Sequence, residues 1–178
     1  MKILLINPPS RRPLPSILPR GVEESRGKFP PLGLLYLAGS LKDIPGLELK
    51  VIDAHAQGQG PERIAREAAE GSYDLAGITV MTFTLLDAME TATAVKAARP
   101  EAVVIAGGPH PHLFPEQTLA LGPFDAVLRG EGEFSFRELV SGWPGSRLKP
   151  PMAFHYYRGI APADLDAIVA HLRTLKPL

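Results

Sequence analysis

Five short apolar runs alternate along this chain with longer segments in which apolar residues recur at helical spacing. Alternation of this kind is typical of a parallel sheet whose strands are joined by crossover helices. The runs, predicted as strands, are Lys2 to Asn7, Leu47 to Asp53, Leu75 to Val80, Ala102 to Ala106 and Ala126 to Arg129. The helices are predicted at Leu32 to Leu41, Pro61 to Ala69, Leu85 to Ala98 and Phe134 to Val140. Because right-handed crossovers place helices on both faces, the pattern predicts an α/β fold with a flavodoxin-like, doubly wound, five-stranded parallel sheet.

Two glycines, Gly107 and Gly108, follow the fourth apolar run. In open α/β sheets, ligands bind beyond the carboxyl ends of the strands, and this pair falls at such an end. Paired glycines allow a ligand to approach the backbone, but they also suit a tight turn with no ligand. The pattern by itself leaves both interpretations open.

Residues 8–31 form a long loop after the first run and contain seven prolines and five basic residues. A loop of this length in a small domain is usually either functional or disordered. Because it emerges at the same predicted sheet edge as Gly107 and Gly108, we predict that it covers a ligand. A flexible insertion is the alternative.

Composition narrows the function further. With 45% hydrophobic content, 178 residues suffice for one well-cored domain and a tail, predicted at 1–141 and 142–178. Nineteen basic and nineteen acidic residues cancel, so neither nucleic acid nor an anionic membrane is a predicted partner. The absence of cysteine excludes disulfides, thiolate metal sites and cysteine nucleophiles. A short apolar N-terminus and the lack of a membrane-length run predict a cytoplasmic protein.

The segment Asp53 to Gly58 reads D-x-H-x-x-G, the motif with which one class of cobalamin proteins supplies a histidine to cobalt. In that class the motif follows the first strand of the domain, whereas here it follows the second. Because strand order decides which loops face the ligand, we interpret His55 as an ordinary loop histidine. Asp53 could also be the ribose-binding acid of a dinucleotide fold. The loop after the first strand, however, lacks the glycines that a pyrophosphate requires.

Three glutamates, Glu131, Glu133 and Glu138, cluster near the last predicted helix and could suggest metal binding or acid–base chemistry. Acidic residues in the first turn of a helix interact favourably with its dipole. We therefore attribute Glu133 and Glu138 to the helix itself. A phosphate-binding P-loop and a G-x-S-x-G motif are both absent.

Five segments, taken together, closely resemble the N-terminal cobalamin-binding domain of class B radical S-adenosylmethionine proteins. They occur in the family's order and cover residues 1 to about 140: Asn7 to Pro9, Pro30 to Ala38, Gly77 to Thr82, Gly107 to Pro111 and Arg129 to Glu133. In that family the domain is flavodoxin-like. The corrin lies across the C-terminal edge of the sheet, and its nucleotide tail runs down beside the strands.

The resemblance implies a set of cofactor-binding residues. They are Asn7, Pro8 and Pro9 in the first loop; Thr79, Val80, Met81 and Thr82 in the third; Gly107, Gly108, Pro109 and His110 beside the tail; and Gly130, Glu131 and Gly132 at the far side. The family commonly binds cobalamin without a protein histidine on cobalt, which agrees with our interpretation of His55.

The sequence departs from the family in one respect. The family's catalytic half would follow residue 140, and its C-x-x-x-C-x-x-C motif holds an iron–sulfur cluster. This sequence reaches residue 178 without a cysteine. We therefore expect a cobalamin-binding module that is not catalytic alone and carries no iron–sulfur cluster. Either a separate radical S-adenosylmethionine polypeptide is its partner, or the chain is a relic or a fragment.

The tail, residues 145–178, resembles the C-terminal end of a c-type cytochrome, in which the methionine matching Met152 is an axial haem ligand. The attachment motif C-x-x-C-H is absent, so no haem is expected. We interpret Ala163 to Leu175 as an amphipathic helix that docks on the first domain or on a partner. A flavodoxin-like module without a ligand, acting through this helix, is the rival hypothesis to cobalamin binding.

Overall fold

The computed structural model describes residues 1–11 and 29–142 of the chain. In order, the elements are β1 (Lys2–Asn7), α2 (Leu32–Leu41), β2 (Glu48–Asp53), α3 (Ala54–Gln57), α4 (Pro61–Glu70), β3 (Leu75–Thr79), η1 (Thr82–Thr84), α5 (Leu85–Ala98), β4 (Val103–Gly107), α6 (Pro109–Leu113), α7 (Pro115–Leu121), β5 (Ala126–Val127) and α8 (Gly132–Ser141). The expected loop cover at 12–28, the cytochrome-like tail with Met152 and the predicted tail helix all lie outside the described residues.

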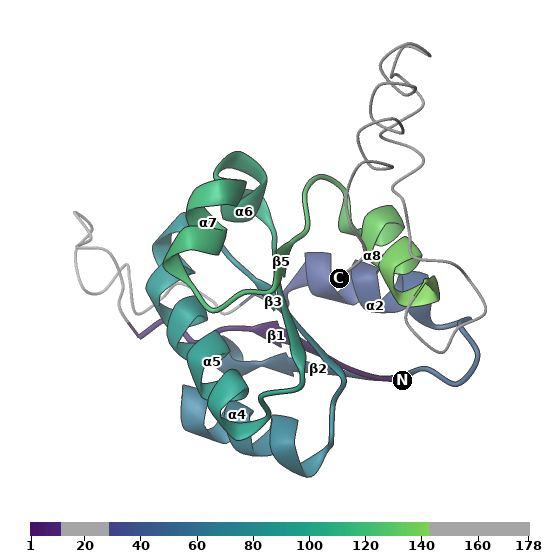
Figure 1. The fold of residues 1–178 in the computed structure, drawn as a ribbon, viewed down its shortest axis with the longest axis horizontal. Coiled ribbons are helices and arrows are strands. Elements are labelled where there is room, and N and C mark those ends of the chain that lie inside the picture. Colours follow the sequence, from purple (N-terminus) through teal and green to yellow (C-terminus); the bar gives the residue numbers. More distant parts are fainter. Residues whose placement is uncertain (12–28, 143–178) are drawn as a thin grey trace, which may run out of the picture. The chain divides into compact units, whose positions relative to one another are not determined.

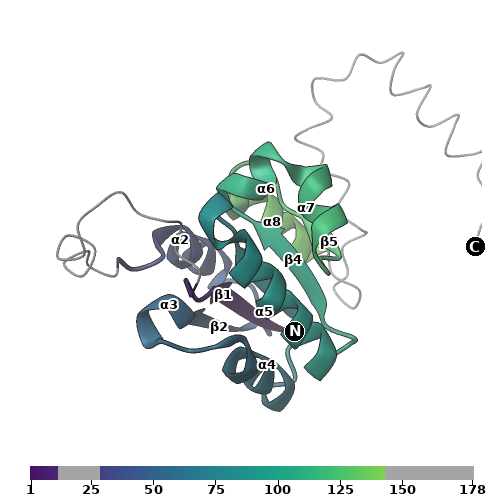
Figure 2. The same ribbon diagram turned by 90° about the vertical axis from the view of Figure 1, so that its left-hand side faces the viewer.

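The five strands form one parallel sheet in the order β2-β1-β3-β4-β5. This is the flavodoxin-like, doubly wound order, so the predicted fold is confirmed. Figure 1 shows α4 and α5 on one side of the sheet and α2 with the start of α8 on the other. Figure 2 looks onto the side that α4 and α5 cover. Since α2 and α5 lie on opposite faces, the chain changes face between β1 and β3.

Alternate residues of the strands face the two sides of the sheet. Toward α4 and α5 lie the members of one continuous core, all fully or nearly fully buried, among them Leu4, Ile6, Ala76, Ile78, Val104 and Ala106. Small residues on both helices, such as Ala68, Ala88 and Ala92, are also fully buried there. Small side chains at these positions let the two helices approach the sheet and each other closely.

The strand predictions agree with the structure to within one or two residues at most ends, and β5 is shorter than predicted. The sequence reading missed the short helices α3, α6 and α7. Prolines mark the beginnings of the last two, since Pro109 and Pro115 are their first residues. Proline suits that position because the N–H it lacks would have no partner within the helix.

The chain divides into two units, Met1–Arg137 and Glu138–Leu178, and the sheet belongs to the first. Helix α8 crosses the boundary. The predicted domain division at residue 141 stays a prediction. In the part of the chain that the structure describes, no helix is both long and apolar enough to cross a bilayer.

Candidate functional site

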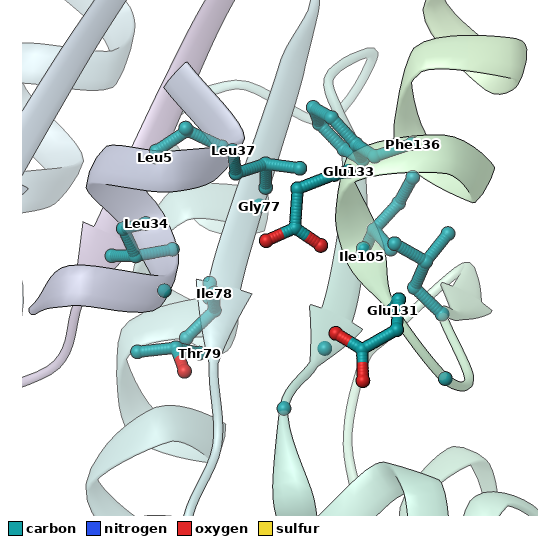
Figure 3. A pocket seen from close by; sticks show the side chains of 16 residues that line it. Leu5, Leu34, Leu37, Gly77, Ile78, Thr79, Ile105, Glu131, Glu133 and Phe136 are labelled. Carbon is teal, nitrogen blue, oxygen red and sulfur yellow. The ribbon is translucent and has the colours of Figure 1, made fainter. Parts of the chain in front are cut away.

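The chain changes face between β1 and β3, and a cavity of about 170 Å³ lies there, bordered by Leu5 of β1 and by the carboxyl ends of β3 and β4. Its floor is one row of paired residues across the three central strands, because Leu5 pairs with Gly77 and Gly77 pairs with Ile105. Helices α2 and α8 form its walls (Figure 3). In open α/β sheets this is the usual position of a ligand.

Gly77 lies at the centre of the floor, where the side chains of Leu5 and Phe136 approach the strand closely. A Cβ built on it would lie 3.0 Å from Cδ2 of Leu5 and 3.7 Å from Cζ of Phe136. Any side chain at this position would therefore occupy the space between the floor and α8. Sequence reasoning did not assign Gly77 to the site, although an isolated glycine inside a strand often marks a close approach.

The glycine pair after β4 has two different roles. Gly108 has a φ of 102°, and a Cβ there would meet Thr79 Oγ1 at 3.0 Å and the backbone N and O of Val80 at 3.2 Å each. The turn itself therefore requires glycine at this position. Gly107, by contrast, would bring its Cβ near only Leu128 Cβ, at 3.8 Å. Both glycines line the cavity. The pair therefore forms the turn after β4 and also borders the cavity.

The lining of the cavity is mainly apolar side chains and glycines. Its polar side chains are Thr79, Glu131 and Glu133, and Figure 3 shows both carboxylates directed at the cavity. Within residues 1–11 and 29–142 neither carboxylate makes a hydrogen bond or an ion pair. Glu131, which precedes α8, is exposed, and Glu133, in the first turn of α8, is half-buried. The complete lining is Leu5, Gly33, Leu34, Leu37, Gly77, Ile78, Thr79, Ile105, Gly107, Gly108, Leu128, Gly130, Glu131, Gly132, Glu133 and Phe136.

The two helical walls are tied together by Arg137 of α8. Its guanidinium donates two hydrogen bonds to the carboxylate of Asp43, at 2.6 and 2.9 Å, and a third to the carbonyl oxygen of Ser40 at the end of α2. The hydrogen bond from Arg137 lowers the pKa of Asp43 and raises the pKa of Arg137 itself. This paired fork joins α8 to the segment at the end of α2.

His110, in α6, carries the one buried histidine nitrogen with no hydrogen-bond partner in the described part of the chain. Its ring is 7% exposed, Nδ1 lies 3.1 Å from Thr82 Oγ1, and Nε2 is the unpartnered atom. The ring also packs against Phe114, with centroids 5.3 Å apart. An unsatisfied buried nitrogen is costly, and a ligand with an amide group can satisfy it whichever tautomer is present.

His112, two residues further on, holds the loop before α8. Its Nδ1 accepts a hydrogen bond of 3.0 Å from the backbone N–H of Gly130, which has a φ of 76°. Gly130, Glu131 and Gly132 of this loop line the cavity. The α6 helix therefore positions one lip of the cavity through a histidine that the sequence reading had not singled out.

The D-x-H-x-x-G segment forms the short helix α3, and two of its motif residues are caps of that helix. Oδ1 of Asp53 accepts from the backbone N–H of Ala56 at 3.0 Å and from Nδ2 of Asn7 at 2.9 Å. Gly58 ends the helix with a φ of 63°. His55 lies within this helix after β2, which is an edge strand. The motif's aspartate and glycine are thus explained by local structure.

The start of the long first loop is attached to α5. The backbone N–H of Arg11 donates to Oδ2 of Asp87 at 3.1 Å, and the Arg11 guanidinium pairs with Glu90. Asp87 is only 1% exposed, so a largely buried carboxylate anchors the loop where it leaves β1. Pro8 and Pro9, immediately before, are buried.

The structure brings most of the predicted site residues to one edge of the sheet. Thr79, Gly107, Gly108, Gly130, Glu131 and Gly132 line the cavity. Val80, Met81 and Thr82 follow β3, and Pro109 and His110 begin α6 after β4. The two segments are joined by the hydrogen bond from His110 N to Val80 O. Asn7, Pro8 and Pro9 follow β1 and are not part of the cavity lining.

Comparison with known proteins agrees with this geometry. A family model described as B12 binding domain matches residues 21–140. The sequence is 36% identical over 158 residues to the uncharacterized methyltransferase PH0819 of Pyrococcus horikoshii, covering 88% of this chain and 32% of that protein. It is 29% identical over 151 residues to the anaerobic magnesium-protoporphyrin IX monomethyl ester cyclase of Cereibacter sphaeroides, covering 84% of this chain and 24% of that protein.

Among solved structures, the fold is similar to that of the cobalamin-dependent S-adenosylmethionine radical enzyme OxsB. The TM-score is 0.56 at 17% sequence identity, over 79% of this chain and 18% of that chain. The chain thus spans a third or less of the length of each of these three proteins.

Proposed function

We propose that this chain, which belongs to the family of B12 binding domains, holds a cobalamin-type corrinoid across the carboxyl edge of its sheet. The observation that carries the proposal is the cavity beside the ends of β3 and β4, whose floor has a glycine, Gly77, at its centre. The corrin ring lies over the edge, and its nucleotide tail enters the cavity between α2 and α8. A concave, mainly apolar site with a few polar groups suits such a ligand.

The residues at the edge fit the ring. The ring lies on two segments, Asn7, Pro8 and Pro9 at the end of β1 and Thr79, Val80, Met81 and Thr82 at the end of β3. Pro109 and His110 lie beside these segments. The unpartnered Nε2 of His110 is a hydrogen-bonding group for the amide rim of a corrin. Exposed apolar side chains of the same loops, Met81, Phe83, Leu113 and Phe114, provide surface for the ring. Gly107, Gly108 and Gly130 to Gly132 border the tail.

When bound, the corrinoid supplies a cobalt ion that can carry an exchangeable axial group. We propose that no histidine of this chain is a ligand of that cobalt. The support is the position of His55 after the edge strand β2, in a helix whose motif residues are caps. The chain would then contribute position and shielding to the corrinoid and leave its axial chemistry to other groups.

The module is proposed to be non-catalytic alone and to work in the cytoplasm with a radical S-adenosylmethionine polypeptide. The absence of cysteine from the 178 residues supports the first part, because a cluster of that type needs thiolate ligands. The same absence means that this chain is proposed to carry no iron–sulfur cluster and no covalent haem. The rival, a ligand-free interaction module, depends on the tail beyond the described residues, and no described contact favours it.

A binding experiment tests the proposal. Purified protein is mixed with hydroxocobalamin and desalted, and we expect a corrin absorption spectrum to remain with the protein. Gly107→Leu fills the mouth without requiring a positive φ and should abolish retention, whereas His55→Ala should retain the corrin with an unchanged spectrum. Gly39→Leu is the matched control, because a Cβ at Gly39 has nothing within 4 Å.

Colourless wild-type protein at saturating hydroxocobalamin would contradict the proposal. A changed corrin spectrum in His55→Ala would instead contradict the part that concerns the cobalt ligand.

A further inference from the structure

Glu133 is half-buried in the wall of a cavity that is otherwise mainly apolar. Figure 3 shows its carboxylate pointing toward the space above Gly77 and Ile105. Within the described residues no protein donor contacts that carboxylate, which water can reach through the cavity. A ligand that displaces this water leaves a charged group without a donor, which is costly unless the ligand supplies one. A ligand segment that fills the cavity would have to meet this acceptor.

The helix dipole does not account for the direction of the side chain. Glu133 is the second residue of α8, where a negative charge is favourable. Glu116 is likewise the second residue of its helix, α7, and it is exposed and does not line the cavity. The dipole thus explains why a glutamate is tolerated at either position. It does not explain why one of the two faces the floor of a cavity.

The level of Glu133 in the cavity indicates which part of a ligand it would meet. Phe136 is one helical turn further along α8, and its ring lies over Gly77. The paired row of Leu5, Gly77 and Ile105 forms the opposite surface. The ring therefore lies against Gly77 and closes the inner end of the cavity, so a flat heterocycle that enters from the mouth would end against it. The edge of that heterocycle would lie beside Glu133, and the sugar would lie nearer the glycines at the mouth.

We propose that Glu133 is a specificity-determining residue that makes the cavity prefer a corrinoid whose lower nucleotide base carries an exocyclic amino group, as adenine does. This inference rests on the proposed function. The amino N–H of such a base donates to the carboxylate. A dimethylbenzimidazole has methyl groups and no donor on its outer edge, and a purine without the amino group also leaves the carboxylate unsatisfied.

The experiment compares three corrinoids by equilibrium dialysis, following corrin absorbance. Adeninylcobamide and purinylcobamide differ only in the amino group, and cobinamide lacks the nucleotide altogether. The wild-type chain should bind adeninylcobamide roughly tenfold more tightly than purinylcobamide, the effect of one donor that satisfies a carboxylate from which the bound ligand excludes water. Glu133→Leu should remove or reverse that preference, Glu133→Gln should keep part of it, and Glu116→Leu should leave it unchanged. Thermal unfolding followed by circular dichroism identifies any variant that fails to fold.

Equal wild-type affinity for adeninylcobamide and purinylcobamide would overturn the inference while leaving the proposed function intact. The inference would also be overturned if Glu133→Leu and Glu133→Gln each weakened the binding of adeninylcobamide and of purinylcobamide equally. The carboxylate would then serve the ribose or the fold. Failure of the wild-type chain to bind any of the three corrinoids would overturn the proposed function, and this inference with it.

Discussion

The two faces of the sheet are built from neighbouring residues of the same strands, yet one is closed and the other is hollow. On the α4 and α5 side, Leu4, Ala76 and Val104 lie beneath helices with small buried residues, and the core is continuous. On the α2 and α8 side, the neighbouring row is Leu5, Gly77 and Ile105, and a cavity of about 170 Å³ remains. The two rows differ most at their centres, where Ala76 belongs to the closed face and Gly77 lines the cavity.

The largest expected effect is on the free energy of unfolding, when two adjacent leucines, one on each face of the sheet, are replaced by alanine. Leu4 and Leu5 are both fully buried, but they face opposite sides. Leu4→Ala should lower the free energy of unfolding by about 3 kcal/mol, and Leu5→Ala by roughly half as much, because Leu5 already borders empty space. Urea unfolding of both variants measures the difference.

Corrinoid affinity should change in the opposite order. Leu5→Ala alters the floor of the cavity, so it should weaken binding several-fold, whereas folded Leu4→Ala should bind as the wild type does. Equal losses of stability for the two leucines would show that the two faces are packed alike.

A second prediction concerns a substitution that partly fills the cavity on the open face. Gly77→Ala adds a methyl group 3.0 Å from Leu5 Cδ2, a contact that a small shift of this side chain relieves. Replacing glycine in a strand should offset that cost through the unfolded state, leaving the free energy of unfolding within about 1 kcal/mol of wild type. Affinity for a complete corrinoid should fall at least tenfold, while affinity for cobinamide, which has no tail, should hardly change.

Gly33→Ala is the control for that variant, because Gly33 also lines the cavity but a Cβ there has nothing within 4 Å. A similar loss for cobinamide in Gly77→Ala would mean that the tail does not occupy the cavity.

Sequence reasoning predicted the sheet well because each strand is a continuous apolar run, a local signal. It missed α6 and α7, which have five and seven residues and so are too short to show a helical period, although each begins at a proline, Pro109 or Pro115. It interpreted His55 of the D-x-H-x-x-G segment as an ordinary loop histidine from strand order alone, and it did not foresee that Asp53 and Gly58 cap a single helical turn. Capping residues and metal-binding residues share the same side chains, so only the local geometry distinguishes them.

The candidate site was predicted in part, through the glycine loops that the family resemblance highlighted. The floor could not be predicted, because Leu5, Gly77 and Ile105 are far apart in sequence and come together only through strand register. Glu133 was attributed to the helix dipole for a similar reason. Periodicity places it in the first turn of α8, but the direction of its carboxylate depends on the neighbouring helix and sheet.

The smallest expected effect concerns the ion pair between Arg137 and Asp43, which joins the two helices that form the walls of the cavity. Arg137 joins α8 to the end of α2 through Asp43, and it lowers the pKa of that carboxyl. A carboxyl whose pKa is lower in the folded state stabilises the fold above its ordinary pKa and loses that contribution as the pH falls through its folded pKa. The urea midpoint of Asp43→Asn should therefore lie slightly below that of the wild type at pH 7, and the difference should shrink below about pH 4.

Because both partners are largely exposed, the change in midpoint is expected to be small and reduced by salt. Arg137→Lys separates charge from geometry, since lysine keeps the charge but cannot form the paired fork. If the fork sets the spacing of the walls, Arg137→Lys should weaken the binding of complete corrinoids as much as Asp43→Asn does, with cobinamide unaffected in both. A midpoint difference that grows as the pH falls would mean that Asp43 is not stabilised in its charged form, and that the walls are spaced by the apolar contacts of α2 and α8 alone.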